Sequence, residues 1–192
     1  DFHMGISNDL CSEKYNVSRE DQDKYAAESY RRTLESIKAG KFKDEIMPVE
    51  IPQRKGDPIR FEQDESARET SYEILAKMSP AFQKDGKATA GNASIISDGA
   101  AAVVVMSRDK ANELGCEIMA TIGAQASAGL EMKYVLVAPI LAIPKVLQKE
   151  GISKGEIDYI IVSFGPQSPY ELCMISYCRQ DIFFSKPSIK NP

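Results

Sequence analysis

The sequence predicts an α/β fold, with parallel or mixed strands in a buried sheet. Apolar segments alternate with helical patterns between residues 99 and 162, and a long amphipathic helix is predicted over residues 18–39. Apolar residues make up 43% and charged residues 27% of the 192-residue chain, which is typical of a globular protein. The length suits one ordinary domain or parts of two.

Residues 18–39 give the clearest helix. Ser18 is a suitable N-cap with acidic residues after it, and Gly40 suits the end of the helix. Apolar side chains recur at helical spacing at Ala26, Tyr30, Leu34 and Ile37. A shorter helix is predicted before it, over residues 6–15.

Residues 42–88 predict a loop-rich layer rather than the centre of a sheet, because prolines, glycines and charges are dense there. Residues 46–51 favour a strand, and Pro48 places it at a sheet edge because proline has no N–H to donate. Residues 72–77 favour one or two helical turns.

Strands and helices are predicted to alternate in the second half of the chain. Residues 100–106 are short, apolar and β-branched at their centre, which is typical of a strand buried on both faces. The elements that follow are a short helix capped by Ser107, a strand over 117–126, a helix over 138–150 that Pro144 either starts or kinks, and a strand over 156–162. Residues 163–192 have no clean periodicity and are interpreted as a loosely docked tail.

Charge and hydropathy argue against two classes of function. The formal net charge is −4 and no Lys/Arg run interleaves with aromatic residues, so nucleic-acid binding is not expected. The densest basic pair, Arg31–Arg32, lies in a helical pattern, where a solvated face explains it. No apolar run approaches the ~20 residues that a membrane span needs.

The residues by themselves reveal no self-contained active site. The four cysteines lack zinc-ligand spacing and His3 is the one histidine, so a metal site is not expected. The G-x-S-x-G, G-x-G-x-x-G and P-loop motifs do not occur. Reduced thiols fit a protein of the cytoplasm, with an organelle matrix such as that of mitochondria or peroxisomes as an alternative.

A run of small residues feeds directly into the apolar segment. This stretch, KATAGNASIISDGAAAVVVMS at residues 87–107, closely resembles the signature of the thiolase family. HMGIS at residues 3–7 resembles the family's H-M-G loop, and further matches follow in order: YNVSREDQDKYAAESYRR, AGKFKDEIMPVEI, KMSPAFQKDGKATAGNAS and ASAGLEMKYVLVAPILAIPKVLQKEGI. The similarity covers residues 3–162 and is greatest to the acetyl-CoA acetyltransferases that form acetoacetyl-CoA.

The resemblance implies the thiolase fold, in which two similar βαβαβαββ halves carry a loop domain inserted in the first. It assigns residues 1–98 to the loop domain that contacts coenzyme A (CoA). Residues 99–115 become the last strand and helix of the N-terminal half, and 116–162 the start of the C-terminal half, with 163–192 a divergent tail. A homodimer or homotetramer is implied for the complete protein.

The resemblance also implies that the small-residue loop lies against the pantetheine arm of CoA. Side chains larger than alanine or serine would then fill the tunnel. Ser94 matches a serine that contacts pantetheine, and Ala90 lines the same wall. His3 and Met4 match the family's H-M pair at the tunnel.

Two further positions are implied at the ends of the ligand. Arg68 matches a basic residue near the nucleotide, where a guanidinium suits phosphate or stacks on adenine. Tyr30 matches a position that in some relatives touches CoA and a potassium ion, for which carbonyls around Ala90, Gly91 and Ala93 would complete the site. CoA enters as substrate, and potassium is the one cofactor option that the resemblance carries.

Each assignment has a structural alternative. These are core packing for Tyr30, a surface ion pair for Arg68, a turn for Ser94, disorder for His3, and tight backbone packing for Gly91 and residues 99–102.

The sequence lacks the catalytic residues that the family uses. A nucleophilic cysteine early in the family's chain, a late histidine and second cysteine, and an N-E-A-F segment at the oxyanion site have no match, and Cys11 and Cys116 fall at neither cysteine position. The expected family activity is acyl transfer between two acetyl-CoA molecules, with no catalysis by this chain alone. A non-catalytic CoA-binding module and a decayed product without function stay open. Without sheet partners for residues 100–106, the chain is expected to be marginally stable or aggregation-prone.

Overall fold

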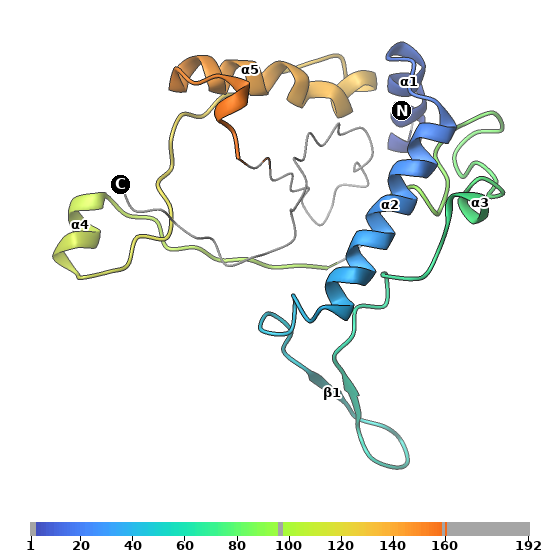
Figure 1. Cartoon of the computed structure of the whole chain (residues 1–192), viewed down its shortest axis with the longest axis horizontal. Helices are drawn as coiled ribbons and strands as arrows, with labels where there is room; N and C mark the ends of the chain where they lie inside the picture. Colours follow the sequence, from blue (N-terminus) through green and yellow to red (C-terminus); the bar gives the residue numbers. More distant parts are fainter. Residues whose placement is uncertain (1–2, 96–97, 159, 161–192) are drawn as a thin grey trace.

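The structure is a computed structural model that describes residues 3–95, 98–158 and 160. Its elements are α1 (Met4–Lys14), α2 (Arg19–Lys38), β1 (Val49–Ile51), β2 (Ile59–Phe61), α3 (Tyr72–Leu75), α4 (Arg108–Glu113), the 3-10 helix η1 (Met132–Val137), α5 (Ala138–Glu150) and the 3-10 helix η2 (Lys154–Glu156). Helices α1, α2 and α3 gather at one end of the molecule, whereas the hairpin and α4 project from it (Figure 1). The predicted tail, 163–192, lies outside the described residues.

The two N-terminal helices are confirmed. Ser18 caps α2 by accepting from the Asp21 amide at 3.0 Å, and the Asp21 carboxylate accepts from the Ser18 amide at 3.1 Å. Gly40 follows the last turn with a φ of 69°, a left-handed conformation that glycine adopts without steric strain. The local signals of this segment therefore fix both ends of α2.

The basic pair Arg31–Arg32 lies on the solvated face of α2, as predicted. Arg31 pairs with Glu28 and Glu35, and Arg32 pairs with Glu28, each at 2.6 Å. The hydrogen bonds that Glu28 accepts from Arg31 and Arg32 lower its pKa to about 2. Exposed pairs of this kind contribute little to folding stability because water screens them.

A small apolar cluster joins the two halves of the sequence, where α1 packs on η1. Ser7 on α1 also donates its hydroxyl to the carbonyl of Lys133 at 2.8 Å. The members of the cluster are Met4, Cys11, Leu136 and Val137, with Leu130 and Tyr134 packed against them. This cluster contacts one face of α1. The opposite face contacts the loop over residues 87–94.

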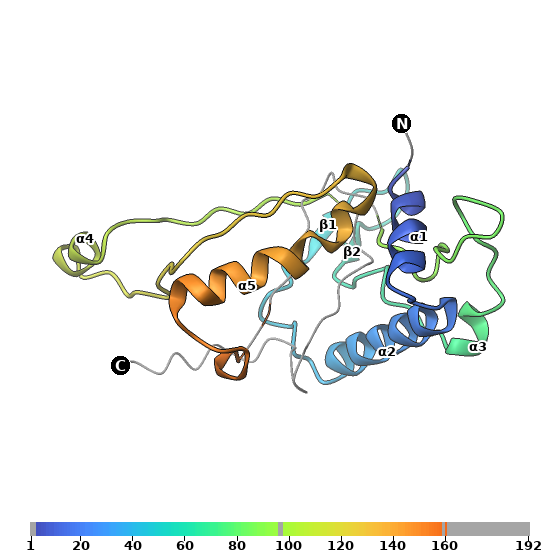
Figure 2. The same cartoon turned by 90° about the horizontal axis from the view of Figure 1, so that it is seen from above.

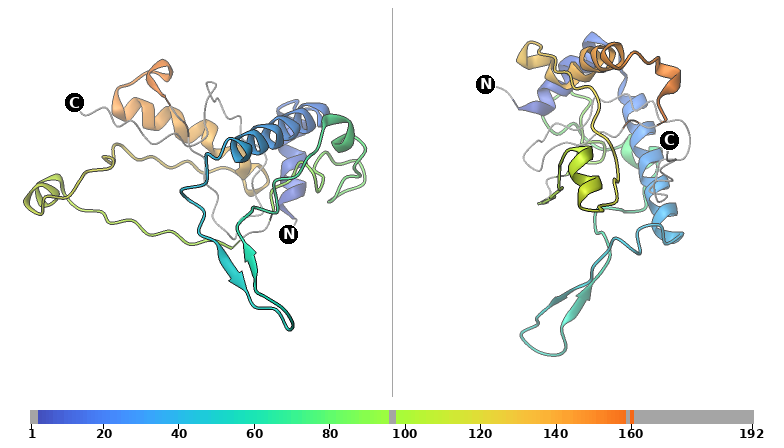
Figure 3. Two further views of the ribbon diagram at one scale, coloured as in Figure 1. Left: turned by 60° about the horizontal axis from the view of Figure 1, so that its bottom comes forward. Right: turned by 90° about the vertical axis from the view of Figure 1, so that its left-hand side faces the viewer.

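The edge strand predicted over 46–51 is confirmed in part. β1 and β2 pair antiparallel, with Val49 opposite Phe61 and Ile51 opposite Ile59. These four apolar side chains share one face of the hairpin and are all exposed. The hairpin stands clear of the helices (Figure 3).

The buried strand predicted over residues 100–106 is wrong for this structure. Residues 101–106 form no strand, and Val103 and Val104 are 84% and 85% exposed. Extended segments on either side of α4 carry that helix away from the others (Figure 2). A strand buried on both faces requires paired neighbours and covering helices, and the described residues bring none beside this segment.

The strand predicted over 117–126 is also wrong, since these residues form no strand. Side chains of α5 instead bind backbone groups at the end of this segment, where Glu150 accepts from the Ala124 amide. Lys149 donates to the carbonyl of Gln125 at 2.7 Å, and Lys145 donates to the carbonyl of Ser127 at 3.1 Å. The segment is thereby held along α5 without forming a ladder. For 156–162, the described positions contain the end of η2 and no strand, and 159, 161 and 162 lie outside them.

The remaining helices are confirmed. Ser107 caps α4 by accepting from the Lys110 amide at 3.2 Å. α5 begins at Ala138 and continues through Pro144, so the helix does not start at that proline. Among the described residues, no helix combines the length and apolar character that crossing a membrane requires.

Candidate functional site

The loop over residues 87–94 owes its shape to two of its own side chains. The Oδ1 of Asn92 accepts from the Thr89 amide at 2.7 Å, and Oγ1 of Thr89 accepts from the amides of Gly91 and Asn92, each at 3.2 Å. The Ala93 amide adds a bond to the carbonyl of Thr89 at 3.0 Å. Thr89 and Asn92 are buried, so these bonds satisfy backbone groups that water does not reach.

A buried carboxylate attaches this loop to α2. The Nδ2 of Asn92 donates to Oδ1 of Asp23 at 2.8 Å, and the other oxygen of Asp23 accepts from Nε of Arg19 at 2.7 Å. Arg19 also donates to the carbonyls of Leu75 and Met78, at 2.8 and 2.9 Å. Asp23 is 0% exposed, and its charge is balanced by Arg19.

Sequence reasoning missed Asp23, Arg19 and Asn92 as parts of the site. A signal for Asp23 was present, since it precedes Ala26 by three and Tyr30 by seven residues and so lies on the same helical face as both. An acidic residue on the apolar stripe of a helix is rarely buried unless it is paired. That pattern predicts a buried polar contact but does not identify its partner.

A second carboxylate attaches the loop to α1. Oδ1 of Asp9 accepts from the amides of Lys87 and Ala88, at 2.7 and 3.2 Å. Its Oδ2 is buried, and within the described part of the chain it has no hydrogen-bond partner. Gly86 lies directly above this oxygen, because a Cβ built on Gly86 would come within 2.4 Å of it.

Asp9→Asn is therefore expected to stabilise the chain by about 1 kcal/mol. The amide keeps the acceptor for the amides of Lys87 and Ala88, while a buried negative charge is removed. Urea unfolding followed by circular dichroism measures the change. Asp85→Asn on the exposed rim is the control, and an Asp9→Asn chain less stable than the wild type would contradict the expectation.

The small residues of the loop have two different environments. Gly91 is buried, and a Cβ at this position would lie 2.5 Å from both Leu75 and Met78, so tight packing accounts for this glycine. Ala90 is exposed instead. The hydroxyl of Ser94 is buried and without a hydrogen-bond partner among the described residues. Residues 99–102 are exposed, so in this structure no packing contact explains why their side chains are small.

His3 and Met4 separate at the start of α1. His3 is the N-cap of the helix, accepts from the Gly5 amide at 3.1 Å and stacks on Phe82, with ring centroids 4.5 Å apart. Met4 is buried in the α1–η1 cluster. His3 is therefore exposed and stacked on Phe82, whereas the Met4 side chain is buried in the core.

Tyr30 and Arg68 lie on separate segments, Tyr30 on α2 and Arg68 between the hairpin and α3. Seven helical residues separate Tyr30 from Asp23, which places it on the same face of α2 about 10 Å further along. Tyr30 is half-buried, so it is neither a full core residue nor free of packing. Arg68 is exposed on the segment that climbs from the hairpin to α3 (Figure 1).

Cys11 is unsuited to nucleophilic chemistry. Its side chain is fully buried in the α1–η1 cluster, and burial raises the pKa of the thiol. A buried thiol in apolar surroundings is inert because the reactive form is the thiolate. The structure thus agrees with a chain that does not carry its own nucleophile at this position.

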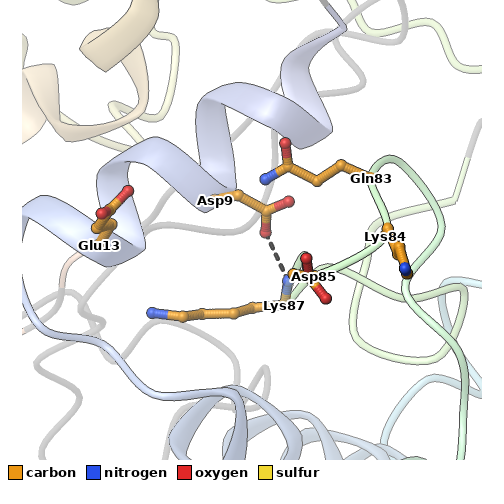
Figure 4. Close-up of a pocket in the computed structure, with 6 residues that line it drawn as sticks. All are labelled: Asp9, Glu13, Gln83, Lys84, Asp85 and Lys87. Carbon is orange, nitrogen blue, oxygen red and sulfur yellow. Dashed lines mark hydrogen bonds between the residues drawn. The ribbon is translucent and has the colours of Figure 1, made fainter.

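A cleft of about 500 Å³ lies between α1 and the residues just before the loop (Figure 4). Its lining is mostly charged. The Lys87 side chain is held in place because its ammonium donates to the carbonyl of Val17 at 2.7 Å. The lining residues are Asp9, Glu13, Gln83, Lys84, Asp85 and Lys87. None of them is a residue that the sequence predicted for ligand binding.

Comparisons with known proteins identify one family. The family model described as "Thiolase, N-terminal domain" matches residues 1–109. An acetyl-CoA acetyltransferase of Pseudomonas aeruginosa is 47% identical over 161 residues, and one of Allochromatium vinosum is 49% identical over 160 residues. Each alignment covers 83% of this chain, which spans about 41% of the length of these relatives.

Solved structures agree with the sequence comparison. The crystal structure of the Bacillus anthracis acetyl-CoA acetyltransferase superposes with a TM-score of 0.74 at 38% identity, covering 82% of this chain and 40% of that one. The enzyme of Syntrophomonas wolfei gives 0.71 at 34% identity. The fold class predicted from the sequence is confirmed by these likenesses, as a partial α/β arrangement.

Proposed function

The chain belongs to the thiolase family, and from this membership we propose that it forms the CoA-binding part of an acyltransferase. The reaction is the condensation of two acetyl-CoA molecules to acetoacetyl-CoA and CoA, or thiolysis in the reverse direction. Relatives that carry the name acetyl-CoA acetyltransferase support this choice of substrate.

One observation carries the binding role. The loop 87–94 is bonded to Asp23 and tightly packed at Gly91, and it combines a small exposed side chain at Ala90 with a buried hydroxyl at Ser94 that has no hydrogen-bond partner among the described residues. Buried polar groups normally have partners, so an unpartnered one beside a small-residue wall is suited to a polar ligand. The amides of a pantetheine arm supply both the donor and the acceptor.

The other predicted residues have distinct roles in this proposal. His3 borders the arm with its exposed ring, supported by stacking on Phe82, and Arg68 binds the phosphate end. Tyr30 lies further along α2 and contacts the bound molecule from that side. Met4 acts only from the core, by fixing the start of α1.

We propose that the chain as written does not catalyse the reaction. The burial of Cys11 leaves that thiol protonated, and the sequence supplies no histidine other than His3 to activate a nucleophile. A second candidate, a CoA-binding module without catalysis, is favoured by this same observation. The complete protein is proposed to be a homodimer or homotetramer of the cytoplasm.

Calorimetric titration of the 192-residue chain with CoA tests the binding role. We expect saturable heat that also appears, more weakly, with pantetheine alone. Absence of heat at millimolar CoA would refute the proposal. A parallel thiolysis assay, followed by the absorbance of acetoacetyl-CoA, is expected to give no turnover, and turnover by the purified chain would contradict the claim of inactivity.

A further inference from the structure

We propose that Asp23 is a positioning residue for the ligand-facing edge of the loop, acting through Asn92. This inference rests on the proposed CoA-binding role of Ala90 and Ser94. It concerns how a carboxylate that touches no ligand determines where those two residues lie.

The carboxylate of Asp23 is the junction of three segments. One oxygen accepts from Asn92 on the loop at 2.8 Å, and the other accepts from Arg19 at 2.7 Å. Arg19 carries the connection to α3 through the carbonyls of Leu75 and Met78. Both oxygens are thus occupied by donors, and the side chain is completely buried.

Asn92 has one orientation that satisfies all its neighbours. Its amide nitrogen donates to Asp23 and to the carbonyl of Lys87 at 3.0 Å, while its oxygen accepts from the Thr89 amide at 2.7 Å. Rotating the amide by half a turn would set donor against donor at Thr89. The acceptor on Asp23 therefore selects the orientation that closes the turn between Thr89 and Asn92.

The turn is confined on its other side by packing. Leu75 and Met78 leave no room for a side chain on Gly91, and the same two residues supply the carbonyls that hold Arg19. The loop backbone is therefore fixed between α2 and α3. Ala90 and Ser94 flank the segment from Gly91 to Asn92, so the position of that segment determines where these two residues lie.

Asp23→Asn tests the inference. It keeps one accepting oxygen and replaces the other with an amide nitrogen, which is a donor and therefore faces the donor of Asn92 or of Arg19. We expect faster hydrogen exchange at the amides of Thr89, Gly91 and Asn92 and a CoA dissociation constant raised on the order of tenfold, through lost preorganisation. Asp57→Asn, at the exposed tip of the hairpin, removes the same charge and is expected to change neither quantity.

A swap of the two side chains separates positioning from general destabilisation. In Asp23→Asn/Asn92→Asp the donor and acceptor across the contact exchange places, whereas the bond from residue 92 to the Lys87 carbonyl is lost, so only part of the CoA affinity lost in Asp23→Asn is expected to return. If Asp23 only stabilises the fold, the CoA affinity of the folded chain is instead expected to be the same in the wild type, in Asp23→Asn and in the double variant. If Asp23→Asn does not fold, Asn92→Ala breaks the same contact and leaves Arg19 and Asp23 paired, although it also removes the bonds to Thr89 and Lys87; an unchanged CoA affinity in this variant would then overturn the inference.

The outcomes are distinguishable from failure of the proposed function. Unchanged loop exchange and unchanged CoA affinity in folded Asp23→Asn would overturn the inference while CoA binding by the wild type stands. A wild-type chain that gives no heat with CoA refutes the binding role itself, and with it the positioning role.

Discussion

Arg19→Met is expected to lower the free energy of unfolding by about 3–5 kcal/mol, the largest effect of any single side chain discussed here. The substitution leaves the carboxylate of Asp23 buried without a counter-charge. It also removes the donor that Arg19 supplies to the carbonyls of Leu75 and Met78, although the Leu75 carbonyl still accepts from the Met78 amide. Methionine retains much of the apolar stem, so packing changes little. Urea unfolding at neutral pH measures the loss.

Arg31→Met on the same helix is the matched control. Arg31 makes charged pairs with Glu28 and Glu35 that are as short as the pair of Arg19, but all three side chains are largely exposed. Water screens such pairs, and a loss below about 1 kcal/mol is expected. Equal destabilisation by the two substitutions would show that burial of Asp23 does not govern the strength of its contact.

Ala90→Phe is expected to weaken CoA binding by on the order of a hundredfold with little change in stability. Ala90 is exposed on the wall proposed to face the pantetheine arm, so a benzyl group there would occupy the space of the ligand without disturbing the core. Calorimetry gives the affinity, and thermal unfolding gives the stability.

Ala39→Phe provides the comparison for Ala90→Phe. It adds the same side chain at another exposed alanine, at the C-terminal end of α2 and away from the loop. CoA affinity is expected to stay unchanged. If Ala90→Phe binds CoA as tightly as Ala39→Phe does, the proposed wall is not in contact with the ligand.

Elements with local signals could be predicted from the sequence. Ser18 and Gly40 define α2 because a cap and a left-handed glycine act within one turn of the helix end. Ser107 likewise marks the start of α4. Residues 100–106 carry a signal of a different kind, since β-branched side chains indicate a strand only where other strands complete the sheet. The described residues provide no such neighbours, and the segment stays unpaired.

In the candidate site, too, features with a local sequence signal could be predicted and contacts between distant residues could not. The loop could be located from its signature of small residues, and the resemblance to thiolases assigns Ala90 and Ser94 within it to the ligand. Tight packing is one of the alternatives that the sequence allows for Gly91, but its partners could not be predicted, because Leu75 and Met78 lie in a separate segment of the chain. The contact between Asp23 and Asn92 could not be predicted either, because the position of Asp23 on the helical face indicates a buried polar contact but not its distant partner.

The contact between Asp23 and Asn92 closes a chain of 69 residues, and this separation has a kinetic consequence. A helix such as α2 forms within about a microsecond, whereas a junction between remote segments forms only after a long loop of chain has closed. We therefore expect the three-way junction to assemble after the folding barrier has been crossed. Weakening it should accelerate unfolding while leaving the refolding rate nearly constant, so the lifetime of the native state depends on this single buried carboxylate.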